Sequence, residues 1–171
     1  TFSVIIFKMK EIKEVLKEIL ENEKVMVIAT SFNEKPWIAP VIYSWDGNKK
    51  FYFLSRITTR HAENILKNQN VAISIYPKEL RPLRGIQMEG KARILKGKEN
   101  FKALKIYIKK FPKAKDRLPY LKEILKERKE FSFFEFEVEK IYLLSEEHFG
   151  WGKRVDVSKI FEENFIIKKS F

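Results

Sequence analysis

The sequence contains no cysteine and only two histidines, His61 and His148. Disulfides, thiolate metal sites and cysteine nucleophiles are therefore excluded, and so is a metal site built from histidines alone. The lack of cysteine fits a reducing cytoplasm, which is the compartment we expect. The apolar start of the chain has no basic segment before it and no small-residue cleavage site after it, so we expect no signal peptide. No apolar run is long enough to cross a bilayer, and we expect no membrane partner.

Glycine and proline are scarce, with 6 of each, whereas phenylalanine is abundant, with 15. No linker rich in Pro, Gly or Ser divides the chain, and no internal repeat stands out. A length of 171 residues with a hydrophobic fraction of 44% suits one domain with a core of its own. We therefore expect a single domain over residues 1–171.

The charge is one-sided, with 35 Lys and Arg against 23 Asp and Glu, a formal net charge of +12. Such a chain attracts anionic partners, which include phosphorylated small molecules, nucleic acid and membrane surfaces. A heat-adapted surface rich in Lys and Glu is an equal alternative explanation. The net charge alone does not choose between a function and a thermophile-like composition.

Hydrophobic periodicity predicts a chain in which strands dominate. Apolar runs bounded by turn residues predict six strands, at 25–30, 37–45, 51–54, 71–76, 86–95 and 131–144. A helical period predicts helices at 10–22, through 64–67 with Thr58 or Thr59 as the cap, at 98–110 and at 118–129, with a short segment at 161–167 in the tail. The order predicts a mainly β fold, a six-stranded antiparallel Greek-key barrel with inserted peripheral helices, and not a Rossmann fold. The barrel core is expected at about 24–144 and a C-terminal tail at 145–171.

Two finer features of the strands can be predicted. Gly90 inside a long alternating strand indicates a bulge or a bend at a barrel corner. Glu135, Glu137 and Glu139 alternate along the last strand, and we expect them to face solvent.

Residues 51–65 carry a resemblance to a known family. They read FYFLSRITTRHAENI, a strand ending in Ser, a short turn, and then Thr-Arg-His opening a helix. This resembles the FMN-binding split barrels related to pyridoxamine-phosphate oxidase, in which the matching Ser or Thr, Arg and Lys hold the FMN phosphate. Residues 59–62, 84–87, 111–112 and 149–153 resemble the small YhbP-like branch of that superfamily. The resemblance covers roughly residues 19–154, and it implies a split barrel, a homodimer with cofactor at its interface, and phosphate contacts from Ser55, Thr59, Arg60 and His61.

Several positions depart from the family pattern. The Arg that begins the flavin-contacting run of the second strand and the Lys that ends it are replaced by Ala39 and Ser44, the phosphate-binding Lys by His61, and a flavin-contacting Gln by Gly85. The resemblance implies that the run itself, Ala39, Pro40, Val41, Ile42 and Ser44, contacts the flavin ring. Backbone groups of such a strand can satisfy the polar edge of a flavin without particular side chains. Trp37, Tyr43 and Trp45 could flank the ring or fill the core.

The residues before Asn64 favour a phosphate site even without the family. A helix N-terminus offers free N–H groups and the positive end of a dipole. Thr58 and Thr59 add hydroxyls, Arg60 adds a bidentate guanidinium, and His61 adds a donor that is strongest when protonated. The alternative is a plain helix cap followed by an exposed arginine.

Two further groups are candidates for the site. Arg81, Arg84, Lys91 and Arg93 form a basic group that could receive an acidic substrate or the phosphate of a neighbouring chain's cofactor, or simply face solvent. The resemblance also implies that Trp151 and the later Arg154 approach the flavin from the partner chain, whereas the alternative is a structural anchor for the tail. The glycines on either side of Trp151 would let the backbone pass close to a flat ring.

Three functional hypotheses follow. The first is an FMN-dependent oxidoreductase acting on an unknown small molecule. The second is a binding module without turnover, for FMN, FAD, deazaflavin or heme, which the departures at Ala39 and Ser44 favour. The third is nucleic-acid binding through the basic and aromatic run 102–115, which we expect instead to be an amphipathic helix with Ile106 and Phe111 inward. We therefore expect a homodimer and a small-molecule substrate as partners rather than nucleic acid.

Overall fold

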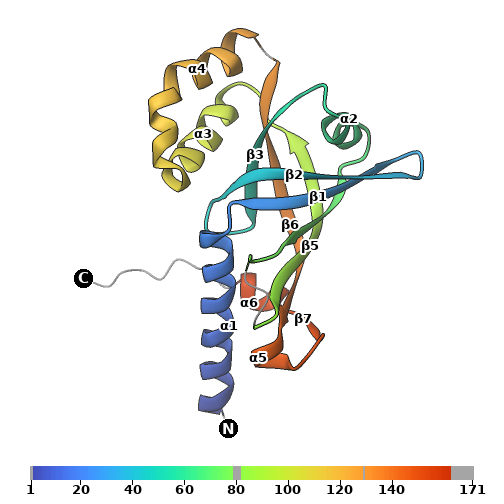
Figure 1. Cartoon of the computed structure of the whole chain (residues 1–171), viewed down its shortest axis with the longest axis vertical. Helices are drawn as coiled ribbons and strands as arrows, with labels where there is room; N and C mark the ends of the chain where they lie inside the picture. Colours follow the sequence, from blue (N-terminus) through green and yellow to red (C-terminus); the bar gives the residue numbers. More distant parts are fainter. Residues whose placement is uncertain (1, 79–81, 129, 163–171) are drawn as a thin grey trace.

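A computed structural model describes residues 2–78, 82–128 and 130–162, and its strands close into a barrel (Figure 1). The strands are β1 (Val25–Phe32), β2 (Lys35–Trp45), β3 (Lys50–Arg56), β4 (Asn70–Ile75), β5 (Arg84–Ile94), β6 (Phe131–Ser145) and β7 (Arg154–Asp156). They are antiparallel in the order β3-β2-β1-β4-β5-β6-β7, and β3 also pairs with β6. The first six strands thus form the predicted Greek-key barrel, because β4 returns to lie beside β1. The short β7 was not predicted, and it extends the sheet from the edge of β6.

Helices cover the outside and the ends of the barrel (Figure 1). They are α1 (Phe2–Asn22), α2 (Arg60–Lys67), α3 (Lys98–Lys110), α4 (Leu118–Glu123), α5 (Glu146–Phe149) and α6 (Ser158–Glu162), with a 3-10 turn at Pro112–Arg117 and a π-helical turn at Ile124–Arg128. The sequence predicted α3 correctly, began α1 too late, and joined α4 and the π-helical turn into one helix. Most of the tail segment predicted at 161–167 lies outside the described residues. Within the described part of the chain, no helix has the length and apolarity needed to cross a membrane.

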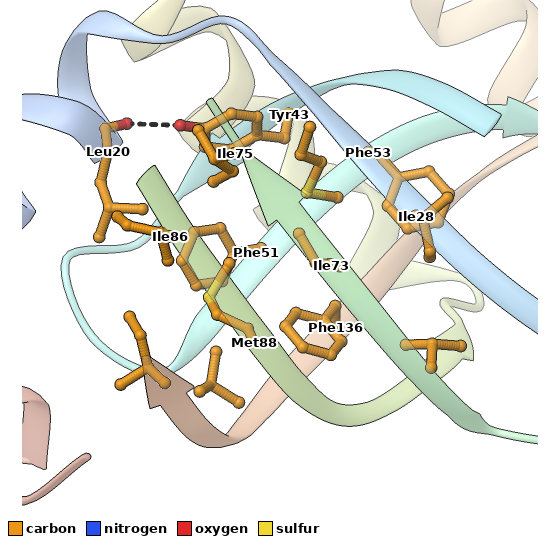
Figure 2. Close-up of a cluster of buried hydrophobic side chains, with 14 of the residues drawn as sticks. Leu20, Ile28, Tyr43, Phe51, Phe53, Ile73, Ile75, Ile86, Met88 and Phe136 are labelled. Carbon is orange, nitrogen blue, oxygen red and sulfur yellow. Dashed lines mark hydrogen bonds between the residues drawn. The ribbon is translucent and has the colours of Figure 1, made fainter. Parts of the chain in front are cut away.

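The barrel interior is filled by aromatic and β-branched side chains (Figure 2). Phe51, Phe53 and Phe136 are fully buried there, and Tyr43 donates its hydroxyl hydrogen bond to the Leu20 carbonyl at 3.0 Å. This bond ties the C-terminal end of α1 to the barrel. Lys110, at the end of α3, donates to the carbonyls of Leu20 and Glu23 at 3.0 and 2.6 Å, so α1 and α3 meet at the same point.

A second, smaller apolar cluster lies outside the barrel, beneath α3 and α4 (Figure 1). Because this layer covers part of the sheet, neighbouring residues of β6 are buried on both faces, with Phe133 under the helices and Phe134 inside the barrel. The expectation that Glu135 faces solvent is therefore wrong. Glu135 is 6% exposed and accepts hydrogen bonds from Lys50 and Arg93, both at 3.1 Å.

The bulge predicted at Gly90 is present. The register between β5 and β6 shifts between Glu89 and Gly90. A Cβ atom at Gly90 would lie 2.1 Å from the carbonyl oxygen of Glu137. Glycine is therefore required here for close approach of the two backbones at the barrel corner.

Candidate cofactor-binding site

Three side chains predicted to hold a phosphate meet where β3 ends and α2 begins. The Oγ of Ser55 lies 2.8 Å from Nε2 of His61 and 3.3 Å from Oγ1 of Thr59, and Thr59 Oγ1 lies 3.1 Å from the same ring nitrogen. Ser55 and His61 are buried, whereas Thr59 is half-buried. The sequence thus located a compact group of hydroxyl and imidazole donors, which we call the phosphate cluster.

Burial sets the protonation of the phosphate cluster. Desolvation lowers the pKa of His61 below its ordinary value, because the charged imidazolium is disfavoured away from water. His61 is therefore neutral near pH 7 in the absence of an anion. A nearby anion reverses this preference, since an opposite charge favours the imidazolium.

The N-terminus of α2 is not capped by a side chain. Thr59 occupies the N-cap position, but its hydroxyl donates to the Arg56 carbonyl at 2.9 Å instead of capping the helix. The predicted cap position is therefore confirmed at Thr59, although its hydroxyl makes no capping hydrogen bond, and Thr58 is exposed in the turn. The first intrahelical bond is donated by Glu63, so the N–H groups of the three residues before it have no partner within the helix.

Arg60 lies over the ring of Trp37, with its guanidinium carbon 4.5 Å from the ring centroid. The pair joins α2 to β2 and restrains an otherwise exposed guanidinium. Sequence reasoning missed this contact because the two residues are 23 positions apart in the chain. Of the three aromatic residues that could flank a flavin, Tyr43 and Trp45 pack in or against the core, and Trp37 stays accessible.

One edge of β2 is open beside the phosphate cluster. β2 pairs with β1 from Lys35 to Ile42 but with β3 only at Tyr43–Trp45. The Tyr43 N–H donates to Lys24 on the β1 side, so by strand alternation Ile38, Pro40 and Ile42 direct their backbone groups to the opposite edge. Pro40 therefore costs the sheet no hydrogen bond, because its nitrogen faces the unpaired edge. A proline at an edge also disfavours pairing with a strand of another molecule.

The side chains of the predicted flavin-contacting run lie in three different environments. Val41 points into the core, while Pro40 and Ile42 are exposed and Ala39 is half-buried. Ser44 is fully buried, and its hydroxyl has no hydrogen-bond partner in the described structure. Only the backbone and the exposed side chains of residues 38–42 are therefore available to a ligand.

The remaining predicted site residues lie at the other end of the barrel (Figure 1). On β6, Ser55 pairs with Ser132 and Arg84 pairs with Ser145, a separation of about 40 Å along an extended strand. Trp151 is 74% exposed, and Arg154 is exposed on β7 near this end. Within one chain, therefore, the structure does not bring these residues to the phosphate cluster.

The predicted basic group is not assembled as one patch. Arg84 makes a bidentate ion pair with Glu18 at 2.9 and 3.1 Å. Lys91 pairs with Glu139, and Arg93 pairs with Glu99 and Glu135. Arg81 lies outside the described residues.

A groove of about 680 Å³ lies at the Arg84 end of the barrel, between the C-terminal end of α1 and the sheet. Its walls include Glu18 and Arg84 as well as the apolar side chains of Val25, Val27 and Tyr76. The last three are all exposed to solvent. The groove therefore adjoins the apolar outer face of β1.

Residues 12–145 match the family described as "Pyridoxamine 5'-phosphate oxidase". The "UPF0306 protein YhbP" of Escherichia fergusonii is 32% identical over 99 residues, which cover 56% of this chain and 67% of that protein. Two solved structures share the fold. A "heme binding protein from Mycobacterium smegmatis" has a TM-score of 0.67 at 19% identity and covers 88% of this chain and 59% of its own. A "Protein related to general stress protein 26(GS26) of B.subtilis (pyridoxinephosphate oxidase family)" from Clostridium acetobutylicum has a TM-score of 0.63 at 17% identity and covers 88% of this chain and 98% of its own. The chain therefore belongs to the pyridoxamine 5'-phosphate oxidase family of split barrels, in its YhbP-like branch.

Proposed function

We propose that the protein binds FMN and acts as a flavin-dependent oxidoreductase on a small molecule. The observation that carries the proposal is the phosphate cluster beside an uncapped helix N-terminus. Ser55, Thr59 and His61 converge within 3.3 Å of one another, and Arg60 stands between the last two in the chain with its guanidinium over Trp37. Hydroxyls, a guanidinium and free N–H groups are the donors that a phosphate monoester needs.

The residues present fit the rest of the cofactor as well. The open edge of β2 offers N–H groups at Ile38 and Ile42 with carbonyls between them, which suits a planar ring with alternating donors and acceptors. Trp37 fixes Arg60 near this edge and leaves one face for a ring. When bound, FMN supplies hydride and electron transfer. The chain's part is to anchor the phosphate, to satisfy the ring's polar edge and to shield the ring from water.

A homodimer is part of the proposal, and the outer face of the barrel supports it. Cross-strand neighbours Val25 and Ile42, Val27 and Pro40, and Ala29 and Ile38 make this face apolar. Ile38 is 66% exposed and Ile42 is 50% exposed, which is unusual for large apolar side chains gathered on one sheet. In such a dimer the tail and the groove of one chain would approach the phosphate cluster of the other.

Ile38→Glu should convert the dimer to a monomer, because a carboxylate in an apolar interface is desolvated without a partner. The measurement is light scattering coupled to size exclusion. The matched control is Leu66→Glu, which places the same charge on an apolar side chain that is 58% exposed on α2. A wild type that runs as a monomer, or equal effects of both variants, would contradict the interface.

A binding module without turnover is the second candidate. The buried Ser44 and the small Ala39 stand where related oxidases carry Lys and Arg, so this site offers fewer cations to a substrate or a flavin ring. The fold also occurs in a heme-binding protein. FAD, deazaflavin and heme therefore remain alternatives to FMN as the cofactor, and the cytoplasm remains the proposed compartment.

The visible absorption spectrum of the purified protein, before and after incubation with FMN and desalting, tests the proposal. A retained spectrum with two flavin bands is expected, followed by turnover when a reductant and candidate acceptors are added. Binding without turnover would favour the second candidate, and a Soret band would favour heme. A protein that stays colourless after FMN is added would refute the proposed cofactor.

FMN binding should be linked to proton uptake by His61. The free protein holds His61 neutral, because burial lowers its pKa, and a bound phosphate dianion favours the imidazolium. Affinity should therefore rise as the pH falls from about 8 to about 6.5, a window in which the phosphate stays mostly dianionic. Calorimetry in buffers of different ionisation enthalpy measures the uptake. The His61→Gln variant should bind FMN without proton uptake. If its affinity for FMN depends on pH as in the wild type, His61 is not the group that takes up the proton.

A further inference from the structure

The helical layer formed by α3, the 3-10 turn, α4 and the π-helical turn carries most of the chain's excess positive charge. Residues 98–128 contain eleven Lys or Arg and four Asp or Glu, a formal excess of seven out of the net charge of +12. The layer lies across the barrel from α2 in Figure 1. The charge is therefore concentrated in one layer and is not spread evenly over the surface.

Four lysines of this layer lie on one exposed side of α3. Lys98, Lys102, Lys105 and Lys109 recur at intervals of four, three and four residues, so they form one exposed stripe along α3. Elsewhere, cations such as Lys50 pair with acidic side chains. Within the part of the chain that the structure describes, no ion pair involves any of the four stripe lysines. A face evolved only for heat resistance would be expected to carry networks of paired charges instead.

An aromatic and basic hollow lies at the C-terminal end of α3. It has a volume of about 440 Å³ and is lined by Tyr107, Lys113, Ala114, Asp116, Arg117 and Leu121. Tyr107 packs against Phe111 with ring centroids 4.8 Å apart, and Tyr120, 48% exposed, precedes the lining residue Leu121. Because Asp116 would repel a phosphate, the hollow suits an uncharged flat ring with anions held around it by Lys113 and Arg117.

We infer that this helical layer binds single-stranded nucleic acid. Lys113 and Arg117 would hold phosphates beside the hollow, and the exposed Tyr120 would offer a ring on which a base stacks. The lysine stripe would contact the phosphate backbone where the strand continues along the exposed side of α3. A cationic track beside aromatic rings is the general arrangement for binding single strands without sequence preference. The inference revises the expectation that the run 102–115 is only an amphipathic helix, and it does not depend on the proposed flavin site.

Fluorescence anisotropy with labelled oligouridylate, oligothymidylate and a duplex of equal length tests the inference over a series of salt concentrations. Both single strands should bind more tightly than the duplex, with affinity falling steeply as salt rises. Lys102→Glu/Lys105→Glu/Lys109→Glu should weaken binding at least about tenfold and reduce the log–log salt slope by about two. Tyr120→Ala should weaken binding on the order of tenfold with the slope unchanged, because stacking does not release counter-ions.

The control is Lys8→Glu/Lys10→Glu/Lys159→Glu, which makes the same change in net charge at exposed lysines of α1 and α6. It should retain most of the affinity, and all variants should keep the flavin spectrum of the wild type. Equal losses in the two triple variants would overturn the inference in favour of general charge attraction. Tighter binding to the duplex, or no binding to any strand at physiological salt, would also overturn it.

Discussion

Arg60→Ala should raise the dissociation constant for FMN on the order of 10- to 100-fold, as measured by quenching of flavin fluorescence. The magnitude follows from the loss of charge-assisted hydrogen bonds to the phosphate, which contribute about 1.5–3 kcal/mol. Arg60 is exposed at the start of α2 and its guanidinium rests on Trp37, so truncation removes a preorganised donor without opening the core. The fold should therefore be unaffected.

Two variants separate the contribution of Arg60 from general electrostatics. Arg56→Ala removes an equal charge four residues earlier, where the guanidinium pairs with Glu130 and lies over Phe131. Its FMN affinity should change less than about twofold, since a surface pair of this kind contributes little. Arg60→Lys should recover part of the affinity, because it restores the charge but not the bidentate geometry. If Arg56→Ala and Arg60→Ala lose equal affinity for FMN, Arg60 does not contact the phosphate specifically.

The strands of the barrel could be predicted because each carries its own local pattern. β1 alternates along its length, β5 carries a glycine where the backbones touch, and turn residues separate the runs. β6 could not be predicted face by face, because α3 and α4 cover it from outside and bury Glu135 against Lys50 and Arg93. The apolar periodicity of a strand does not show whether helices will cover its outer face. β7 was missed because three exposed residues, Arg154–Asp156, have no apolar pattern and depend on the edge of β6.

The phosphate cluster could be predicted because its members lie within seven residues of chain, from Ser55 to His61. The Arg60 contact with Trp37 could not, since it depends on how α2 packs against β2. The same limit applies to the residues at the far end. Arg84 was predicted as part of a basic group that could receive an anionic ligand, but only the structure reveals that its guanidinium pairs with Glu18.

Gly90→Ala should be the most destabilising single-methyl change in the barrel. The new Cβ would lie 2.1 Å from the Glu137 carbonyl oxygen and 3.0 Å from the Phe136 ring, and neither can move without displacing β6. Because β6 is paired to β3, β5 and β7, its displacement disturbs most of the sheet. We expect a loss of about 3 kcal/mol or more in the free energy of unfolding, measured by chemical denaturation. That is a large part of the about 5–15 kcal/mol available to a domain of this kind.

Gly85→Ala, on the same strand, is the matched control for this prediction. There the new Cβ would meet the edge of the Tyr76 ring at 3.0 Å and the Ile75 carbonyl at 3.3 Å. Tyr76 is exposed and can rotate away, so the cost should stay near 1 kcal/mol. If the Gly90→Ala protein is recovered only in inclusion bodies while the Gly85→Ala protein is soluble, this would also show that Gly90→Ala is the more destabilising change. Equal denaturation midpoints for the two variants would contradict the prediction. They would mean that β5 and β6 can separate at Gly90 without loss of stability, so that the bulge is not required to close the barrel.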